Sequence, residues 1–143
     1  MVEKLHISWE DFHNHTKQLA QKIKASGEYN KIIAISRGGL VPAGIISYEL
    51  DIRNTHAINI SSYDGECQRE ICNIDIDVNA GSVDEKTLII DDLSDTGTTL
   101  RLLRQMFPNA RFATVYAKPK GVNDVDIFAQ ALPDKWVVFP WDI

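Results

Sequence analysis

The sequence predicts an α/β domain in which a mostly parallel central sheet is flanked by helices. Short β-branched apolar runs, typical of buried strands, alternate with segments whose apolar residues recur at helical spacing. The connections between them are mostly short, and strands linked through helices in this way form parallel sheets covered on both faces. We expect one domain over residues 1–143, because no repeat, low-complexity tract or Pro/Gly-rich linker divides the chain.

The first part of the chain supplies two helices and two strands. In order, we expect a helix beginning at about residue 9, a strand at 31–36, a helix at 40–50 and a strand at about 57–61. Ser8 is placed to cap the first helix, with Asp11 three residues later. Gly38 and Gly39 separate the first strand from the second helix.

The second part begins with a polar stretch over residues 62–84, which predicts a long loop with at most a weak hairpin. The elements expected after it are a strand at 87–91, a helix at 98–107, a strand at 111–117 and a strand at 136–139. In a sheet of this class, ligands bind at the carboxyl ends of the strands. The polar or Gly-rich segments at those ends are 36–39, 61–63, 91–99 and 117–119.

Composition and charge exclude several classes of function. The net charge of −5 argues against binding of nucleic acid through a basic face. No apolar run approaches the roughly 20 residues of a membrane span, and the first residues lack the layout of a signal peptide, so we expect a cytoplasmic protein. Cys67 and Cys72 have no second Cys/His pair that would complete a zinc site, and we expect reduced thiols.

The strongest chemical signal follows the strand at 87–91. Asp91 and Asp92 end an apolar run, Asp95 follows three residues later, and Thr96-Gly97-Thr98-Thr99 opens a helix. Backbone N–H groups and hydroxyls at a helix N-terminus suit a phosphate monoester, and carboxylates suit sugar hydroxyls and a hard divalent cation. A helix cap with acidic residues would account for one of these carboxylates, but not for three in five residues, where their repulsion is costly.

This segment resembles the phosphoribosyl-pyrophosphate (PRPP) signature of the type I phosphoribosyltransferases. Residues 36–42 resemble that family's pyrophosphate loop, and residues 61–70 resemble its mobile loop. Residues 117–119, Trp136 and residues 140–142 resemble the purine pocket of the bacterial xanthine-guanine enzymes. The resemblance implies the type I fold, with a small hood formed by the chain ends.

The resemblance also implies roles for the matching residues. In the PRPP site, Asp91 and Asp92 would hold the ribose hydroxyls and the Mg²⁺ shell, with Asp92 as the metal ligand. The 5′-phosphate would be surrounded by Thr96, Gly97, Thr98 and Thr99. The pyrophosphate would be contacted by Arg37, Gly38 and Arg69. In the purine site, Lys118 would bond O6, Trp136 would stack on the base, and the Val137 backbone would meet the 2-position. Asp95 would be catalytic at the purine N7, and the Ser36–Arg37 peptide bond would be cis.

The implied activity is transfer of 5-phosphoribosyl from PRPP to hypoxanthine, guanine or xanthine, with Mg²⁺ as cofactor, by a homodimer or homotetramer. Two alternatives stay open: a non-catalytic PRPP-sensing regulator on the same fold, and a phosphoribosyltransferase for another acceptor. His13 and His15 are not a metal pair, because two residues apart on a helix they point about 200° away from each other.

Overall fold

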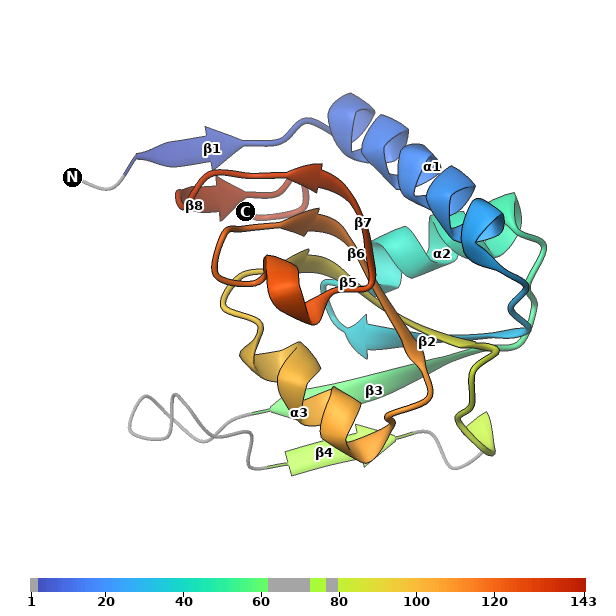
Figure 1. The fold of residues 1–143 in the computed structure, drawn as a ribbon. Helices are drawn as coiled ribbons and strands as arrows, with labels where there is room; N and C mark the ends of the chain where they lie inside the picture. Colours follow the sequence, from blue (N-terminus) through green and yellow to red (C-terminus); the bar gives the residue numbers. More distant parts are fainter. Residues whose placement is uncertain (1–2, 62–72, 77–79) are drawn as a thin grey trace.

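The computed structural model describes residues 3–61, 73–76 and 80–143 (Figure 1). Its elements are, in order, β1 (Lys4–His6), α1 (Trp9–Ser26), β2 (Lys31–Ser36), α2 (Leu40–Glu49), β3 (Thr55–Ser61), β4 (Asn73–Ile76), β5 (Thr87–Ser94), α3 (Thr98–Met106), β6 (Arg111–Ala117), the 3₁₀ turn η3 (Val122–Asp124), β7 (Ile127–Ala131) and β8 (Trp136–Val138). The predicted α/β class with a mostly parallel sheet is confirmed.

The central sheet has the strand order β4-β3-β2-β5-β6-β7. All neighbouring strands are parallel except β3 and β4, which pair antiparallel. The connection from β2 through α2 leads outward to β3, whereas the connection from β5 through α3 leads outward to β6. The chain therefore changes direction between β2 and β5, and sheets of this kind bind ligands where that change occurs.

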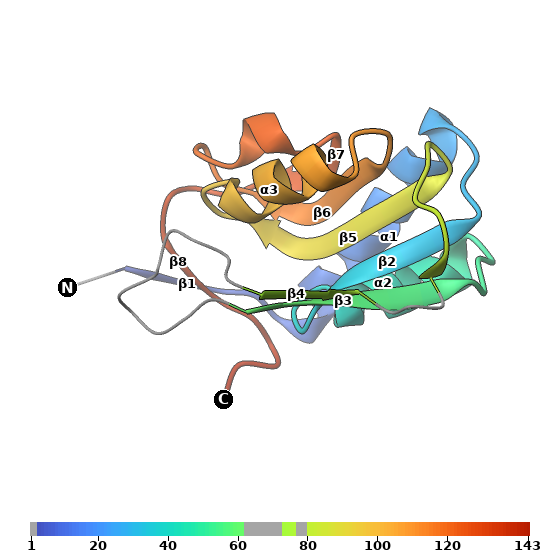
Figure 2. The same ribbon diagram turned by 90° about the horizontal axis from the view of Figure 1, so that it is seen from below.

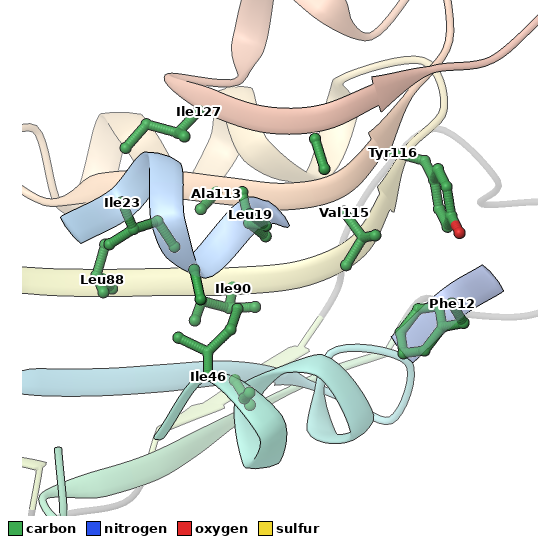
Figure 3. Close-up of a cluster of buried hydrophobic side chains, with 14 of the residues drawn as sticks. Phe12, Leu19, Ile23, Ile46, Leu88, Ile90, Ala113, Val115, Tyr116 and Ile127 are labelled. Atoms are coloured by element: carbon green, nitrogen blue, oxygen red, sulfur yellow. The ribbon is translucent and has the colours of Figure 1, made fainter. Parts of the chain in front are cut away.

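Alternating residues of the strands contribute side chains to two apolar cores, one on each face of the sheet. On one face, Ile32 and Ile90 pack with side chains of α1 and α2; Figure 3 shows Ile46 of α2 and Leu19 of α1 beside this row. On the other face, Ile89 packs with the buried side chains of α3. Figure 2 shows α3 and the two longer helices separated by the sheet.

The start of α1 follows the predicted capping. The Ser8 hydroxyl accepts a hydrogen bond from the Asp11 N–H at 3.1 Å. Phe12, Leu19 and Ile23 form its buried stripe. Satisfying a free N–H at a helix start contributes about 1 kcal/mol, so the cap and the apolar spacing together fix this helix.

Several boundaries differ from the sequence prediction. β5 continues to Ser94, three residues past the predicted end, because Leu93 and Ser94 still pair with β6. β1 and β7 were not predicted, because both strands are short and because β7 contains few β-branched residues. β4 lies within the predicted loop, and its antiparallel pairing with β3 is the weak hairpin that the prediction for this stretch allowed.

The two ends of the chain meet in a separate parallel pair. Leu5 of β1 lies opposite Val137 of β8, and the two strands lie side by side beyond the central sheet (Figure 1). This pair is the small hood that the resemblance implied. Within the described ranges, no helix combines the length and apolar character needed to cross a bilayer.

Candidate active site

The carboxyl ends of β2 and β5 separate and leave space between them. The pairing of β2 with β5 stops at Ala34 and Ile90, although β5 continues along β6. A cavity of about 820 Å³ lies at this point. Its lining comes from the loop after β2, from the start of α2, from β5, and from the last residues of the chain: Arg37, Gly38, Leu40, Val41, Asp92, Phe139, Trp141, Asp142 and Ile143.

The loop after β2 brings its backbone close to β5. The Ser36–Arg37 peptide bond is cis, as predicted. A Cβ placed on Gly38 would come within 2.5 Å of the Asp92 Oδ2 atom, and a Cβ on Gly39 would overlap the Ile90 carbonyl oxygen. Only glycines allow so close an approach, so the loop presents bare backbone beside the Asp92 carboxylate.

Asp91 and Asp92 are adjacent, partly buried carboxyl groups on the last part of β5. The Asp92 N–H donates to the Asp91 Oδ1 atom at 2.8 Å. Burial raises the pKa of Asp91 well above its ordinary value, and the charge of Asp92 raises it further. Burial also raises the pKa of Asp92. Within the described ranges neither carboxylate forms an ion pair with a lysine or arginine, so the pair favours a cationic or hydroxyl-donating ligand.

The turn from Thr96 to Thr99 leads into α3 and encloses a small pocket. The pocket holds about 100 Å³ and is lined by Asp91 and by residues 93–100. Gly97, with φ of 84°, precedes the helix without a side-chain cap, and the Thr98 N–H donates to the Thr96 Oγ1 atom at 3.5 Å. The Thr96 and Thr98 hydroxyls lie 3.0 Å apart. We call residues 96–99 the phosphate cradle, because backbone N–H groups and hydroxyls at a helix start bind phosphate monoesters.

Lys118 lies beside Asp95 at the neighbouring strand end. Its side chain is buried, with the residue 6% exposed, and its Nζ atom is 3.4 Å from the Asp95 Oδ1 atom. Asp95, whose side chain is 59% exposed, faces outward from the cradle turn. The structure thus brings together the residues predicted to contact purine O6 and N7.

The Lys118 turn is attached to the end of β5 through Ser94. The Ser94 carbonyl accepts from the Lys118 N–H at 3.0 Å, and the buried Ser94 hydroxyl donates to the Gly121 carbonyl at 2.8 Å. A Cβ on Gly121 would overlap the Ser94 carbonyl. Two hydrogen bonds and a close backbone contact therefore fix where Lys118 leaves the sheet.

Trp136 and Val137 come from β8 in the hood. Trp136 is 63% exposed and takes no part in the ring–ring contacts of the described residues, whereas Val137 is buried. An exposed indole face is available to stack on a planar ligand. Its predicted stacking on a purine stays a prediction.

Sequence reasoning missed the contribution of Phe139, and it assigned Trp141 to the purine pocket only through the family resemblance. Their rings stack with centroids 4.7 Å apart, and Trp141 also meets Phe12 of α1 edge-on at 4.9 Å. This cluster holds the chain end against the cavity beside Asp92. The aromatic spacing in Phe139-Pro140-Trp141 was the available signal. Arg69, predicted at the pyrophosphate, lies outside the described residues, as does most of the predicted mobile loop.

Comparison with known proteins gives a consistent result. The family described as phosphoribosyl transferase domain matches residues 8–143. The chain is 47% identical over 138 residues to the xanthine-guanine phosphoribosyltransferase of Idiomarina loihiensis, covering 96% of this chain and 86% of the relative. It is also 47% identical over 137 residues to that of Nitratidesulfovibrio vulgaris, covering 95% and 83%. The crystal structure of a purine phosphoribosyltransferase from Pyrococcus horikoshii superposes with a TM-score of 0.81 at 28% identity, covering 98% of this chain and 94% of that one.

Proposed function

The chain belongs to the phosphoribosyl transferase domain family, and we propose that it transfers the 5-phosphoribosyl group from PRPP to a 6-oxopurine. The products are a nucleoside 5′-monophosphate and pyrophosphate. The observation that carries the proposal is the buried Lys118 ammonium, 3.4 Å from Asp95 and next to the phosphate cradle. The xanthine-guanine relatives at 47% identity support the same class of acceptor.

Lys118 and Asp95 offer complementary groups to one edge of a purine. An ammonium donates hydrogen bonds only, and O6 of a 6-oxopurine is an acceptor. A carboxylate accepts a proton, and the neighbouring N7 carries one in a tautomer of the free base. Asp95 therefore takes the N7 proton as a purine ring nitrogen bonds to C1′, a contribution typically worth ~10²–10⁴-fold in rate.

The remaining residues hold PRPP. The phosphate cradle receives the 5′-phosphate, and Asp91 and Asp92 accept hydrogen bonds from the ribose hydroxyls. Arg37 and the Gly38 backbone, with Arg69, bind the pyrophosphate. As the C1′–O bond breaks, positive charge grows on the ribose and negative charge on pyrophosphate, so these donors bind the leaving group more strongly in the transition state.

The donor set also fits Mg²⁺. Asp91 and Asp92 are adjacent carboxylates without a lysine or arginine partner in the described ranges. These ranges contain no group of three His, Cys, Asp or Glu side chains that could hold a metal ion by itself. Mg²⁺ is commonly held by one or two carboxylates, with water and substrate phosphates completing its octahedral shell. When bound, the ion would neutralise charge developing on pyrophosphate. We place Asp92 as its protein ligand.

The direct test incubates the purified protein with PRPP, Mg²⁺ and guanine, xanthine or hypoxanthine, and measures pyrophosphate and nucleoside 5′-monophosphate together. We expect the two products in equal amounts. PRPP binding without turnover on any base would instead indicate the sensing regulator, and turnover only in a parallel assay with a pyrimidine would indicate another acceptor. The expected cytoplasmic location, the homodimer or homotetramer, and the absence of a nucleic-acid partner stay predictions.

A further inference from the structure

A carboxylate lies directly behind the phosphate cradle. Asp124 ends the turn η3 between β6 and β7, and its side chain is only 14% exposed. A Cβ on Gly97 would overlap the Asp124 Oδ2 atom, so the cradle backbone is packed against this carboxylate. A negative charge at this place opposes binding of a phosphate dianion unless a cation offsets it.

Arg101 supplies that cation from the first turns of α3. Its guanidinium donates to the Asp124 Oδ2 atom at 2.7 Å. The same group reaches the Thr96 carbonyl at 3.4 Å and the Thr98 hydroxyl at 3.5 Å. One planar guanidinium therefore connects η3 to two residues of the cradle turn, a geometry that a fork of several N–H donors allows.

The segment that ends at Asp124 begins at Lys118. Lys118 reaches Asp95 at one end, Gly121 is fixed to Ser94 in the middle, and Asp124 reaches Arg101 at the other end. A single connection between β6 and β7 thus contacts both the proposed purine site and the phosphate cradle.

We infer that Arg101 and Asp124 form a positioning pair for the 5′-phosphate of PRPP. Asp124 holds the guanidinium against the cradle turn, and the guanidinium offsets the Asp124 charge and draws the phosphate. The inference rests on the proposed function and adds to it a charged pair outside the PRPP signature. Neither residue is placed on the reacting atoms.

The test measures the dissociation constant of Mg²⁺–PRPP by calorimetry, which requires no knowledge of the acceptor base. Arg101→Gln leaves the Asp124 carboxylate uncompensated, and we expect binding weaker by about tenfold or more. Asp124→Asn leaves the cation in place but untethered, and we expect roughly threefold weaker binding. In the Arg101→Gln/Asp124→Asn double variant the repulsive charge is also gone, so it should bind PRPP more tightly than Arg101→Gln alone.

Two further variants separate positioning from general loosening. Arg101→Lys retains the charge and should recover most of the affinity. Arg104 lies one turn later on α3, donates to the Asp124 carbonyl at 2.9 Å and pairs with Asp126 at 3.2 Å. Arg104→Gln therefore removes a cation from the same helix and a contact from the same turn, and should leave PRPP affinity within about twofold. Thermal unfolding of every variant identifies any that fails to fold.

The inference is overturned if folded Arg101→Gln binds PRPP normally. It is equally overturned if the double variant is as weak as the product of the two single effects, or if Arg104→Gln matches Arg101→Gln. Failure of the proposed function has a different signature, which is normal PRPP binding by the unmodified protein without turnover on any base.

Discussion

At the scale of single residues, the site depends on charges that the fold keeps close together. The Lys118 ammonium is almost fully buried, and its carboxylate neighbour Asp95 is largely exposed. A buried ammonium requires hydrogen-bond acceptors, because removing it from water without them costs several kcal/mol. Asp95 supplies a charge partner at 3.4 Å, and a ligand oxygen at the purine site would supply an acceptor.

Asp95→Asn should lower kcat by about 100-fold while the dissociation constant of PRPP stays near normal. The amide keeps the shape of the side chain but cannot accept the N7 proton. Steady-state kinetics with hypoxanthine, combined with PRPP calorimetry, measures both quantities. Glu28→Gln, an equal charge change at an exposed position before β2, is the control and should change neither. Retained kcat with weakened PRPP binding would reassign Asp95 to the sugar.

Gly38→Ala should weaken PRPP binding by about tenfold or more. The new methyl group would come within 2.5 Å of the Asp92 Oδ2 atom and must displace that carboxylate. Gly44→Ala in α2 is the matched control, because a Cβ there meets nothing within 4 Å. The control should leave PRPP affinity unchanged and raise the free energy of unfolding by about 0.5–1 kcal/mol. Equal PRPP affinity in both variants would remove Asp92 from the site.

At the scale of elements, position in the sheet matters more than any one side chain. β5 continues for four residues past its last pair with β2, and these residues include Asp91 and Asp92, which therefore lie beside the end of β2. The turn at residues 118–121 is then fixed to Ser94, the last residue of β5. The residues proposed to be catalytic and purine-binding are therefore placed by how far one strand extends.

Ser94→Ala should lower the free energy of unfolding by about 1–2 kcal/mol, because the Gly121 carbonyl loses its hydroxyl donor in a buried place. It should also raise KM for the purine several-fold through Lys118, with PRPP affinity near normal. Ser47→Ala removes a similar hydroxyl-to-carbonyl bond in α2, at 2.6 Å, and should alter neither constant. An unchanged purine KM would show that Ser94 does not position Lys118.

Sequence patterns predicted most of the elements because their apolar periodicity is strong. α1, β2, α2, β5, α3 and β6 lie close to the predicted ranges. β1 and β7 escaped prediction because three to five residues carry too little periodicity, and their pairing depends on distant partners. The contact between Asp124 and Arg101 was not predicted for a similar reason: the two residues are 23 positions apart, and only the fold brings them together.

At the scale of the whole molecule, an acidic chain is proposed to bind a polyanionic substrate. The net charge is −5, so no general attraction for phosphates exists and binding must come from local donors. Those donors gather at one edge, where the chain changes direction between β2 and β5. The hood covers the same edge with residues from both chain ends (Figure 1).

The fold and the signature in β5 could be predicted from the sequence, because both are local in the chain. The cavity lining from Phe139 could not, and Trp141 was assigned only through the resemblance, since their position depends on their mutual stacking and on the contact of Trp141 with Phe12 of α1. The cis Ser36–Arg37 bond was predicted only through family resemblance and is confirmed. The roles given to individual site residues stay predictions.

The most direct test of the central claim is the ratio of kcat/KM for hypoxanthine to that for adenine, measured with PRPP and Mg²⁺. Adenine presents an amine donor where hypoxanthine presents O6, so the buried Lys118 ammonium would face a donor and would have no acceptor on the base. We predict a ratio of at least ~100, and a smaller ratio in Lys118→Ala, in which hypoxanthine turnover falls. Adenine used within about tenfold of hypoxanthine by the unmodified protein would contradict the assignment of this site to 6-oxopurines.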